Sequence, residues 1–594
     1  MPEVEQKAER VKNPIKSAIR DAERISDPLD LLVEAAKNDP ETAYSPEALD
    51  ELSALKKLDP VRFERIRRHL KRAGVRVAEL ERAIAARRMS SSKKIRQPTD
   101  VFVDLLNDAE LFHTSDGTAY ADVNIGGNRH TLSVMGDGFR RWLTHRYYEE
   151  CDAAATTETL KSAVGFADAK AQVDGLEREV FLRTAHLAGR YYLDLADKEY
   201  RVVEIHEGGW HIVQRPQVRF RRSPGMLSLP VPVDGGSIEQ LMPFLNLRRE
   251  TDFVLVVSWL LAALREHTSY PVLAISGEQG AAKSTFSKML RSLVDPSVSP
   301  VRALPQSDRD LQIGADNSHV LAYDNVSALP HSISDALCRM ATGAGFALRK
   351  LYSDRQETLF AASRPLILNG INNAVVRADL ADRAISLVLE AIPASRRRTD
   401  TEIWKEFEEA RCQILGALMS GMVMGLQEMP HVRLHSPPRM ADLAYWATAC
   451  EKAYWPAGTF QDAYRANRKE ASAQVLEADT VALAVRNLMT DRAGWTGTAS
   501  ELLSKLEADL DDRIRKSKSW PSVPNQLSRR LNRAAPVLRE MGITLEHTLD
   551  GHARTRLIVI SNTAKVSEDS PSASSASLKV STSEDPRQSS TSGG

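Results

Sequence analysis

The sequence has few cysteines, no long apolar run and no net charge, and each absence excludes a class of protein. The four cysteines in 594 residues form no C-x-x-C pair, which argues against a disulfide scaffold or a zinc ribbon. The longest apolar run, Phe253 to Leu264, is shorter than the roughly 20 residues that a membrane span requires. The first residues, MPEVEQKAERVKN, lack the apolar core of a secretory signal. We therefore expect a cytoplasmic protein of several domains that has no membrane partner.

The absence of net charge conceals two basic segments. Lysine plus arginine and aspartate plus glutamate both number 79. Residues 60–97 nevertheless hold thirteen basic and three acidic residues, and residues 513–556 hold ten basic and three acidic residues. These segments flank a mildly acidic middle, an asymmetry that is typical of proteins that contact a polyanion. The neutrality of the whole chain therefore does not exclude DNA as a partner.

Composition and periodicity predict a multidomain α/β protein of six regions. We expect a basic helical region and linker at 1–97, an α+β domain of unknown role at 98–236, a P-loop domain at 237–430, a helical region at 431–496, two helices and a strand pair at 497–560, and a disordered serine-rich tail at 561–594. In the P-loop domain, the runs PVLAIS, SHVLAYD, RPLILNG and RAISLVLEAI alternate with amphipathic helices, which predicts a mostly parallel sheet. In the N-terminal region, the expected apolar residues are Val61, Ile66, Leu70, Val75 and Leu80.

The segment PVLAIS-GEQGAAKST-FSKMLRSLV is typical of a phosphate-binding loop between a strand and a helix. Small residues let backbone N–H groups surround phosphates, and the helix N-terminus adds a partial positive charge. Lys283 would reach the β- and γ-phosphates of ATP, and Ser284 would hold Mg²⁺. Ala282 replaces the glycine that usually precedes the lysine, and alanine fits most helix-entry geometries. The predicted nucleotide-binding residues are Gly277, Glu278, Gln279, Gly280, Ala281, Ala282, Lys283, Ser284 and Thr285.

Polar residues follow three later segments, where an ATPase needs them around the phosphates. SHVLAYDN places Asp324 at the carboxyl end of an expected neighbouring strand, where an acid meets the water shell of Mg²⁺. RPLILNG places Asn369 where an amide can sense the γ-phosphate and orient water. Arg383 closes a short helix, and in a ring assembly it would stabilise the charge on the neighbouring subunit's ATP. Arg377 is a rival candidate for that role.

The order of P-loop, Asp-ending strand, intervening hairpin, Asn-ending strand and arginine resembles the superfamily III helicase branch of the AAA+ ATPases. The segments GEQGAAKST, LAYDNVSALP, LCRMATGAGFALRKLYSD, RPLILNGI and DLADRA more closely resemble a bacterial family of prophages and integrated elements, which is described only as ATP-binding. This resemblance extends from about residue 100 to residue 560. It implies an AAA+ fold, ATP and Mg²⁺ as cofactors, a homo-oligomer such as a hexameric ring, and single-stranded or forked DNA as the partner.

The resemblance also implies a DNA-contacting hairpin and raises a question about hydrolysis. Superfamily III helicases insert a basic β-hairpin into the central channel, and FALRKLYSDRQETLF occupies that place here. Its candidate DNA contacts are Arg349, Lys350 and Arg355. Asn325 follows Asp324 where many related ATPases carry the glutamate that polarises the attacking water. Glu278 and Asp316 are the candidate substitutes for that glutamate.

The C-terminal order of helix, helix and strand pair resembles a winged helix. Its candidate DNA contacts are Arg529, Arg530 and Arg533 in the second helix and Arg554 and Arg556 in the wing. These cations would neutralise phosphates with little sequence choice. A basic module that binds a protein would show the same pattern.

Taken together, these patterns favour an ATP-hydrolysing DNA helicase or translocase of mobile-element replication. The alternative is an ATP-switched DNA-binding or assembly protein, including a defence or regulatory ATPase, that does not unwind DNA. Asn325 favours the alternative because an amide cannot act as a general base.

Overall fold

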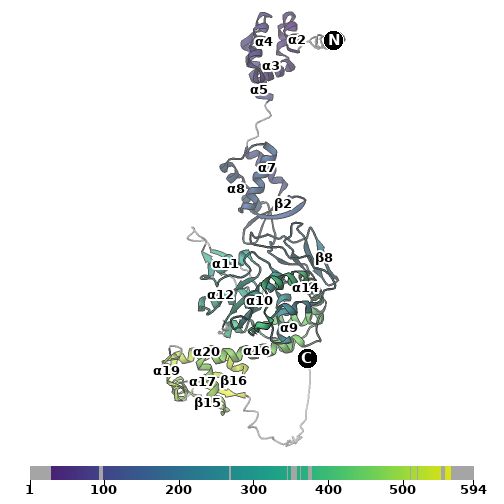
Figure 1. Ribbon diagram of the computed structural model, residues 1–594. Helices are drawn as coiled ribbons and strands as arrows, with labels where there is room; N and C mark the ends of the chain where they lie inside the picture. The colour runs from purple at the N-terminus through teal and green to yellow at the C-terminus, as the bar shows by residue number, and fades with distance from the viewer. Residues whose placement is uncertain are drawn as a thin grey trace, which may run out of the picture. The chain divides into compact units, whose positions relative to one another are not determined.

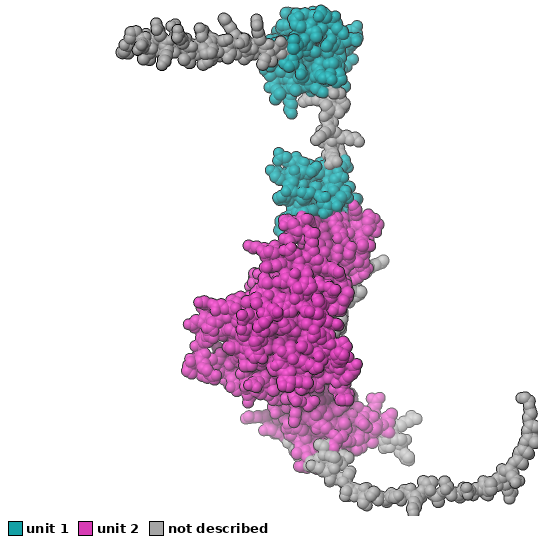
Figure 2. All heavy atoms as spheres, turned by 90° about the vertical axis from the view of Figure 1, so that its right-hand side faces the viewer, with its two compact units in different colours: residues 1–108, 137–167 teal, residues 109–136, 168–594 magenta. Residues whose placement is uncertain are grey.

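The structure is a computed structural model in which contacts divide the chain into two compact units (Figures 1 and 2). Unit 1 comprises residues 1–108 and 137–167, and unit 2 comprises residues 109–136 and 168–594. The residues that the structure describes are 28–91, 98–266, 269–343, 346–349, 357–360, 363–371, 378–508, 510–517, 520–549 and 555–563. Among these residues, we find no helix of the length and apolarity needed to cross a bilayer.

The described part of unit 1 begins with a helical bundle at residues 28–91, which confirms the predicted helical character of these residues. Its elements are α2 (Pro28–Asn38), η1 (Pro40–Tyr44), α3 (Pro46–Leu58), α4 (Pro60–Arg72) and α5 (Val77–Ser91). Ser45 and Asp59 cap α3 and α4, because their side-chain oxygens accept hydrogen bonds from the N–H groups of Ala48 and Arg62. A proline at the first helical position of each helix has no N–H group to leave unsatisfied.

The core of the bundle is set by the apolar spacing on α4. Phe63, Ile66 and Leu70 are buried there, together with Leu52 of α3. Val61, which we expected to be part of the apolar face, is instead 81% exposed. That prediction is wrong because Phe63, three residues before Ile66, occupies the buried face and turns Val61 toward solvent.

The rest of the described part of unit 1 is helical. It consists of α6 (Pro98–Leu105), η2 (Leu106–Asp108), α7 (Asp137–Cys151) and most of α8 (Thr157–Val173). The rings of Phe102 and Tyr147 stack with their centroids 4.6 Å apart and hold α6 against α7.

Unit 2 begins with two four-stranded sheets, so residues 98–236 contain the expected mixture of helices and strands. The first sheet, in the order β3-β2-β1-β4, contains β1 (Glu110–His113), β2 (Ala119–Ile125), β3 (Asn128–Ser133) and β4 (Leu176–Glu177). The second is an antiparallel meander of β5 (Thr184–Leu187), β6 (Arg190–Asp194), β7 (Val202–His206) and β8 (Gly209–Val213). Leu193 and Ile205 of the second sheet share one hydrophobic core with the P-loop region that follows.

The predicted parallel sheet is present, with strand order β10-β13-β9-β14. Its strands are β9 (Val272–Gly277), β10 (Leu321–Tyr323), β13 (Leu366–Gly370) and β14 (Ala384–Leu389), and all three strand pairs are parallel. Alternate residues of β9 enter different cores: Leu273 and Ile275 join one, Val272 and Ala274 the other. Both faces are therefore covered, which explains the continuous apolar runs of these strands.

Helices and a hairpin complete the P-loop region. They are η3 (Ile238–Phe244), α9 (Glu250–Ala263), α10 (Lys283–Val294), α11 (Asp308–Asn317), α12 (His331–Thr342), β11 (Phe346–Arg349), β12 (Glu357–Phe360), α13 (Ala378–Ala381), η4 (Ala394–Arg396), α14 (Asp400–Glu428) and η5 (Met429–His431). The apolar run that begins at Phe253 lies in α9, where twelve successive residues from Asp252 to Ala263 are buried. It is thus a core helix of a globular fold.

The C-terminal part of unit 2 is helical and then mixed. Its elements are α15 (Ala441–Glu451), α16 (Thr459–Ala478), α17 (Thr480–Met489), β15 (Gly494–Gly497), α18 (Ala499–Ala508), α19 (Asp512–Arg515), α20 (Pro524–Glu540), β16 (Ile543–Leu549) and β17 (Arg556–Asn562). The expected strand pair is confirmed, because β16 and β17 are antiparallel, and β15 adds a third strand beside β17. β17 extends to Asn562, so the first two residues of the expected tail are in a strand. Residues 564–594 lie outside the described part of the chain.

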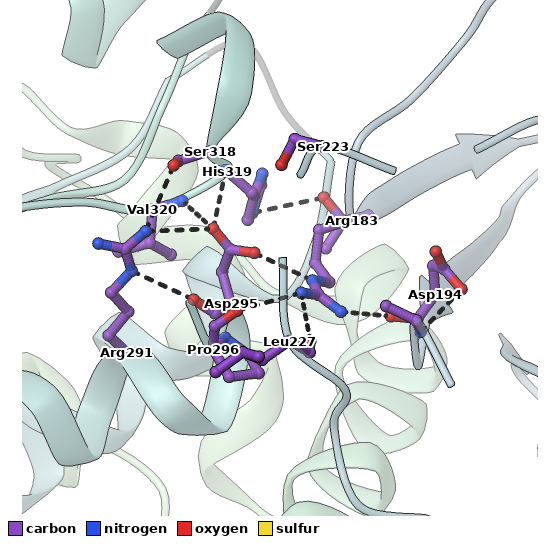
Figure 3. Close-up of polar contacts among 12 residues, drawn as sticks. Arg183, Asp194, Ser223, Leu227, Arg291, Asp295, Pro296, Ser318, His319 and Val320 are labelled. Atoms are coloured by element: carbon purple, nitrogen blue, oxygen red, sulfur yellow. Dashed lines mark hydrogen bonds and ion pairs between the residues drawn. The ribbon is translucent and has the colours of Figure 1, made fainter. Parts of the chain in front are cut away.

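A buried ion pair fixes the helix after the predicted phosphate-binding loop to the second sheet (Figure 3). The guanidinium of Arg183, just before β5, is fully buried and donates from Nε to Oδ1 of Asp295 at 3.0 Å. The other oxygen of Asp295 accepts from the backbone N–H groups of His319 and Val320 at 2.9 and 3.1 Å. Although burial opposes ionisation, the charges of Arg183 and Arg291 hold the pKa of Asp295 below its usual value.

Candidate functional site

The predicted phosphate-binding loop runs from the end of β9 at Gly277 to the start of α10 at Lys283. Its backbone takes positive φ angles at Gly277 (150°), Gly280 (86°) and Ala282 (60°). A Cβ atom at Gly277 would lie 2.2 Å from the carbonyl oxygen of Leu389, so only glycine fits there. The backbone of Ala282 is in the left-handed region, which favours glycine. Alanine is therefore less well suited to this helix start than we expected from the sequence.

Lys283 is folded back over the loop that precedes it. Its Nζ donates to the carbonyl oxygens of Gly277 and Glu278 at 2.8 and 2.7 Å. Burial lowers the pKa of Lys283, and the charge of Asp324 opposes that shift, which places the carboxylate within electrostatic reach of the ammonium. Both residues lie at the same edge of the parallel sheet, because Lys283 contacts the end of β9 and Asp324 follows the end of β10.

The other predicted loop residues differ in exposure. Ala281 is fully buried, whereas Glu278, Gln279 and Gly280 are exposed. Ser284 and Thr285 are half-buried in the first turn of α10. The exposed backbone at the helix N-terminus can thus receive an anion, with hydroxyl groups at its base.

Asn369 connects the phosphate-binding helix to the turn after β10. Its side chain is 1% exposed, donates from Nδ2 to the hydroxyl of Ser287 at 2.9 Å, and accepts at Oδ1 from the N–H of Asn325 at 3.2 Å. The strand order places β13 between β9 and β10, so the strand of Asp324 is not the direct neighbour of the loop strand that we expected. Asn369, near the end of the intervening strand, therefore links Ser287 to Asn325, the residue that follows Asp324.

The backbone explains why asparagine follows Asp324. Asn325 has a φ of 55°, in the left-handed region that asparagine adopts more readily than most other residues. Its N–H also donates to Oδ1 of Asp324 at 2.8 Å, which orients the carboxylate. Of the two candidate substitutes for the missing glutamate, Glu278 is exposed on the loop, whereas Asp316 is ion-paired with Arg221.

Arg383 lies at the opposite end of the sheet from its own phosphate-binding loop. It directly precedes β14, whose first residue pairs with Val272 and whose last pairs with Gly277. At 3.3 Å per residue, the six residue steps from Arg383 to Leu389 separate Arg383 from the loop by about 20 Å along the strands. The guanidinium donates to the carbonyl oxygen of Asp379. Arg383 is therefore too far from the phosphate-binding loop of its own chain to contact it, and Arg377 lies outside the described residues.

The candidate DNA contacts are described only in part. β11 and β12 form the predicted antiparallel hairpin, with Arg349 as the last residue of β11. Lys350, Arg355 and Arg554 lie outside the described residues.

On the C-terminal module, the structure places several predicted cations at the surface. Arg529 and Arg533, four residues apart on α20, are exposed, as is Arg556 at the start of β17, and Arg530 is half-buried. The opposite face of α20 packs through Leu527 and Leu531 into the core. The predicted division of α20 into an apolar and a basic face is thus confirmed.

Two stretches of the chain match one protein family. Residues 238–472 match the family described as "Actinomycete integrative conjugative element replication protein", and residues 481–577 match its "AICE RepA C-terminal domain". Together these matches cover more than half of the 594 residues. The chain belongs to this family. The expected link to integrated elements is therefore confirmed, and the chain is a replication protein of a mobile element.

Solved structures and curated proteins add little to the family assignment. The A form apo structure of the NrS-1 C-terminal region is 12% identical, with a TM-score of 0.35 over 78% of this chain and 100% of that chain. "SCCmec type IV Cch - active helicase" is 10% identical, with a TM-score of 0.39 over 77% of this chain and 93% of that chain. At TM-scores this low, neither similarity carries an argument. No curated protein matches the chain.

In this replication protein, two residues that the sequence did not single out contact the phosphate-binding loop. Asn246 donates from Nδ2 to the carbonyl oxygens of Ala281 and Glu390 at 3.2 and 2.6 Å. Arg397 lies beside the loop, with its guanidinium 3.9 Å from where a Cβ of Gly280 would be. Asn246 lies in no recognisable motif. The sequence signal at Arg397 is the run of three arginines at 396–398.

Proposed function

We propose that this replication protein is a Mg²⁺-dependent ATPase that moves on or unwinds DNA during replication of its mobile element. One observation carries the proposal: Lys283, Asp324 and Asn369, predicted separately from three segments, lie at the carboxyl ends of β9, β10 and β13 in one parallel sheet. A phosphate-binding loop beside an acid and a buried amide is the arrangement that phosphoryl transfer requires. A replication protein of an actinomycete element acts on DNA, and bacterial DNA lies in the cytoplasm. We therefore place this activity in the cytoplasm.

The residues of the site fit ATP and Mg²⁺. The exposed N–H groups at the start of α10 would bind the phosphates, and Lys283 would leave the carbonyls of Gly277 and Glu278 to pair with them. Ser284 and Asp324 would hold Mg²⁺, which neutralises charge on the β- and γ-phosphates when bound. Asn369 would orient the attacking water, and Glu278 is the better placed candidate to accept its proton, because Asp316 is ion-paired.

The position of Arg383 supports an oligomer, which we propose to be a hexameric ring. Since Arg383 is at the far end of the sheet from its own loop, it can stabilise transition-state charge only on ATP bound by a neighbouring subunit. Each site would then be built from Lys283 of one chain and Arg383 of the next. In that ring, β11 and β12 would present Arg349, Lys350 and Arg355 to the DNA in the channel.

The order of elements supports a winged-helix module at the C-terminus. The chain runs α17, β15, α18, α19, α20, β16 and β17, and β17 lies between the other two strands. α20 would then be the DNA-contacting helix, with Arg529, Arg530 and Arg533 on phosphates and Arg554 and Arg556 in the wing. Because these contacts are to the backbone, we propose single-stranded or forked DNA of any sequence as the partner.

A strand-displacement assay on a forked duplex tests this proposal. Wild type should release the labelled strand with ATP and Mg²⁺, whereas Lys283→Ala and Arg383→Ala should each abolish release. Mixing the two inactive variants should restore part of the activity, because some junctions then combine an intact Lys283 with an intact Arg383. Arg396→Ala, in η4, is the matched arginine control and should behave as wild type. Failure of the mixture to recover would contradict shared sites.

The second candidate is an ATP-switched DNA-binding or assembly protein, including a defence or regulatory ATPase. Asn325 favours it, because no acid follows Asp324 to activate water. ATP-dependent assembly on DNA with no turnover would support this candidate. A C-terminal module that retains a protein and no DNA would favour the regulatory form.

A further inference from the structure

The helix α4 of the N-terminal bundle is unusually basic. It contains Arg62, Arg65, Arg67, Arg68, Lys71 and Arg72, and its only acidic residue is Glu64. The preceding described residues, 28–59, hold eight acidic and three basic residues. The positive charge of this bundle is therefore concentrated on α4 and the segment after it.

The packing of α4 determines which of its arginines face solvent. Phe63, Ile66 and Leu70 are buried in the bundle, so the opposite side of the helix is exposed. Arg65, Arg68 and Arg72 are exposed on that side, at spacings of three and four residues. We call these three residues the α4 arginine face.

The side chains of this face carry uncompensated charge. Within the described residues, no ion pair forms to Arg65, Arg68 or Arg72, although Nε of Arg68 donates to the backbone oxygen of Glu64 at 3.3 Å. The two nearby acids are used elsewhere, because Arg67 pairs with Glu64 at 2.9 Å and with Glu81 at 2.7 Å. Like charges three and four residues apart repel each other, so a bound polyanion would relieve a strain that the free helix carries.

The spacing of the face fits a regular row of phosphates. Seven residues separate Arg65 from Arg72, a length of about 10.5 Å at 1.5 Å per residue. One strand of B-DNA presents about three phosphates over that length, at 3.4 Å per nucleotide along the helix axis. Proteins that bind single strands also stack bases on exposed aromatic rings. Phe63 is the sole Phe, Tyr or Trp of residues 60–91, and it is buried.

We propose that the α4 arginine face is a second DNA-binding site, which holds the phosphate backbone of double-stranded DNA without reading its sequence. The face is separate from the phosphate-binding loop and from α20, so it does not depend on the ATPase or on the winged-helix module. A duplex held there would remain tethered to the protein while another part of the chain engages a single strand.

The salt dependence of duplex binding by the full chain tests this inference. The variant is Arg65→Gln, Arg68→Gln and Arg72→Gln combined, and the probe is a short labelled DNA duplex followed by fluorescence anisotropy without nucleotide. Each lost phosphate contact should lower the slope of log affinity against log salt by about 0.9, so three lost contacts should lower it by about 2–3. The matched control, Lys37→Gln, Lys56→Gln and Lys57→Gln, removes the same charge from α2 and α3 and should leave the slope unchanged.

A second variant guards against a folding artefact. Arg65→Lys, Arg68→Lys and Arg72→Lys keeps the charges and should keep the wild-type slope, with circular dichroism confirming that each variant is folded. ATP hydrolysis in the absence of DNA should be equal in all of them, which separates this test from that of the proposed ATPase. Equal slopes for the glutamine variant and wild type would overturn the proposal. So would a loss seen only with a single-stranded probe, or the absence of duplex binding by wild type.

Discussion

Two of the three residues with positive φ in the loop before α10, Gly277 and Ala282, differ in which substitutions they tolerate. Gly277 faces the carbonyl oxygen of Leu389 across a space too small for a Cβ atom. Ala282 already carries a Cβ in the left-handed region, which costs an L-residue roughly 1–2 kcal/mol. The first position is thus limited by packing and the second by backbone conformation.

Ala282→Gly should therefore stabilise the protein, by about 1 kcal/mol once the greater chain entropy of glycine is subtracted. Nucleotide affinity should be retained, because the loop geometry is unchanged. Gly277→Ala is the contrasting variant and should lose both stability and nucleotide binding. Denaturant unfolding and equilibrium titration with a labelled ATP analogue measure the two properties. A destabilised Ala282→Gly would contradict the left-handed assignment.

Glu266, which is half-buried, and His319, which is buried, are ionisable groups that share one neighbour. The hydroxyl of Thr184 lies 3.0 Å from Oε2 of Glu266 and 3.4 Å from Nε2 of His319. Burial raises the pKa of Glu266 to about 7 and lowers that of His319 to about 4. Between about pH 4 and pH 7 both groups are therefore neutral in the folded protein, and their contributions to stability change with pH in opposite directions.

Replacing Glu266 by Gln should change how stability depends on pH. Between the ordinary value of 4.5 and about 7, the folded protein retains a proton on Glu266 that the unfolded chain has lost. Wild-type stability therefore declines as pH rises through this window, by about 1.4 kcal/mol per pH unit from this group. Glu266→Gln should become steadily more stable relative to wild type from pH 4.5 to 7. A difference between the two unfolding free energies that does not vary with pH would refute this.

At the level of elements, α16 connects the Arg383 segment to α20. Arg468 of α16 pairs with Asp382 at 2.7 Å and with Glu540 at 2.8 Å. Asp382 directly precedes Arg383, and Glu540 is the last residue of α20. The candidate arginine finger and the candidate DNA-contacting helix are thus anchored to the same side chain.

Arg468→Met should weaken this anchor. The Arg468 side chain is 15% exposed, and its loss would leave Asp382 without this partner in a poorly solvated site, so we expect a cost of about 1–3 kcal/mol. The matched control is Arg465→Met on the same helix, whose side chain is 75% exposed and pairs with Asp462, and it should change stability by less than about 0.5 kcal/mol. Thermal unfolding of both variants checks the difference. Equal effects would mean that the pairing at Arg468 contributes nothing.

Sequence patterns predicted the elements better than their arrangement. Continuous apolar runs identified all four parallel strands, because both faces of that sheet are covered. The insertion of β13 between β9 and β10 was not predicted, since strand order depends on long-range packing that local periodicity does not record. The buried pair of Arg183 and Asp295 was missed for the same reason, as 112 positions separate the two residues.

For the whole molecule, zero net charge results from cancellation between distant regions. The α4 arginine face and the exposed arginines of α20 lie at opposite ends of the sequence, with the phosphate-binding loop between them. The loop residues were predictable because phosphate binding requires small residues and a lysine at fixed spacing. Asn246 was not predictable, because a hydrogen bond from a residue 35 positions away leaves no local motif in the sequence.

DNA-stimulated ATP hydrolysis is the most direct measurement of the central claim. Steady-state turnover by the full chain would be measured with Mg²⁺, with and without single-stranded DNA, for wild type and Lys283→Ala. The account predicts that DNA stimulates wild type and that Lys283→Ala loses turnover by about 100-fold or more, because the lysine stabilises charge on the transferred phosphoryl group. Wild-type protein that binds ATP without hydrolysing it, or hydrolysis that Lys283→Ala retains, would contradict the account.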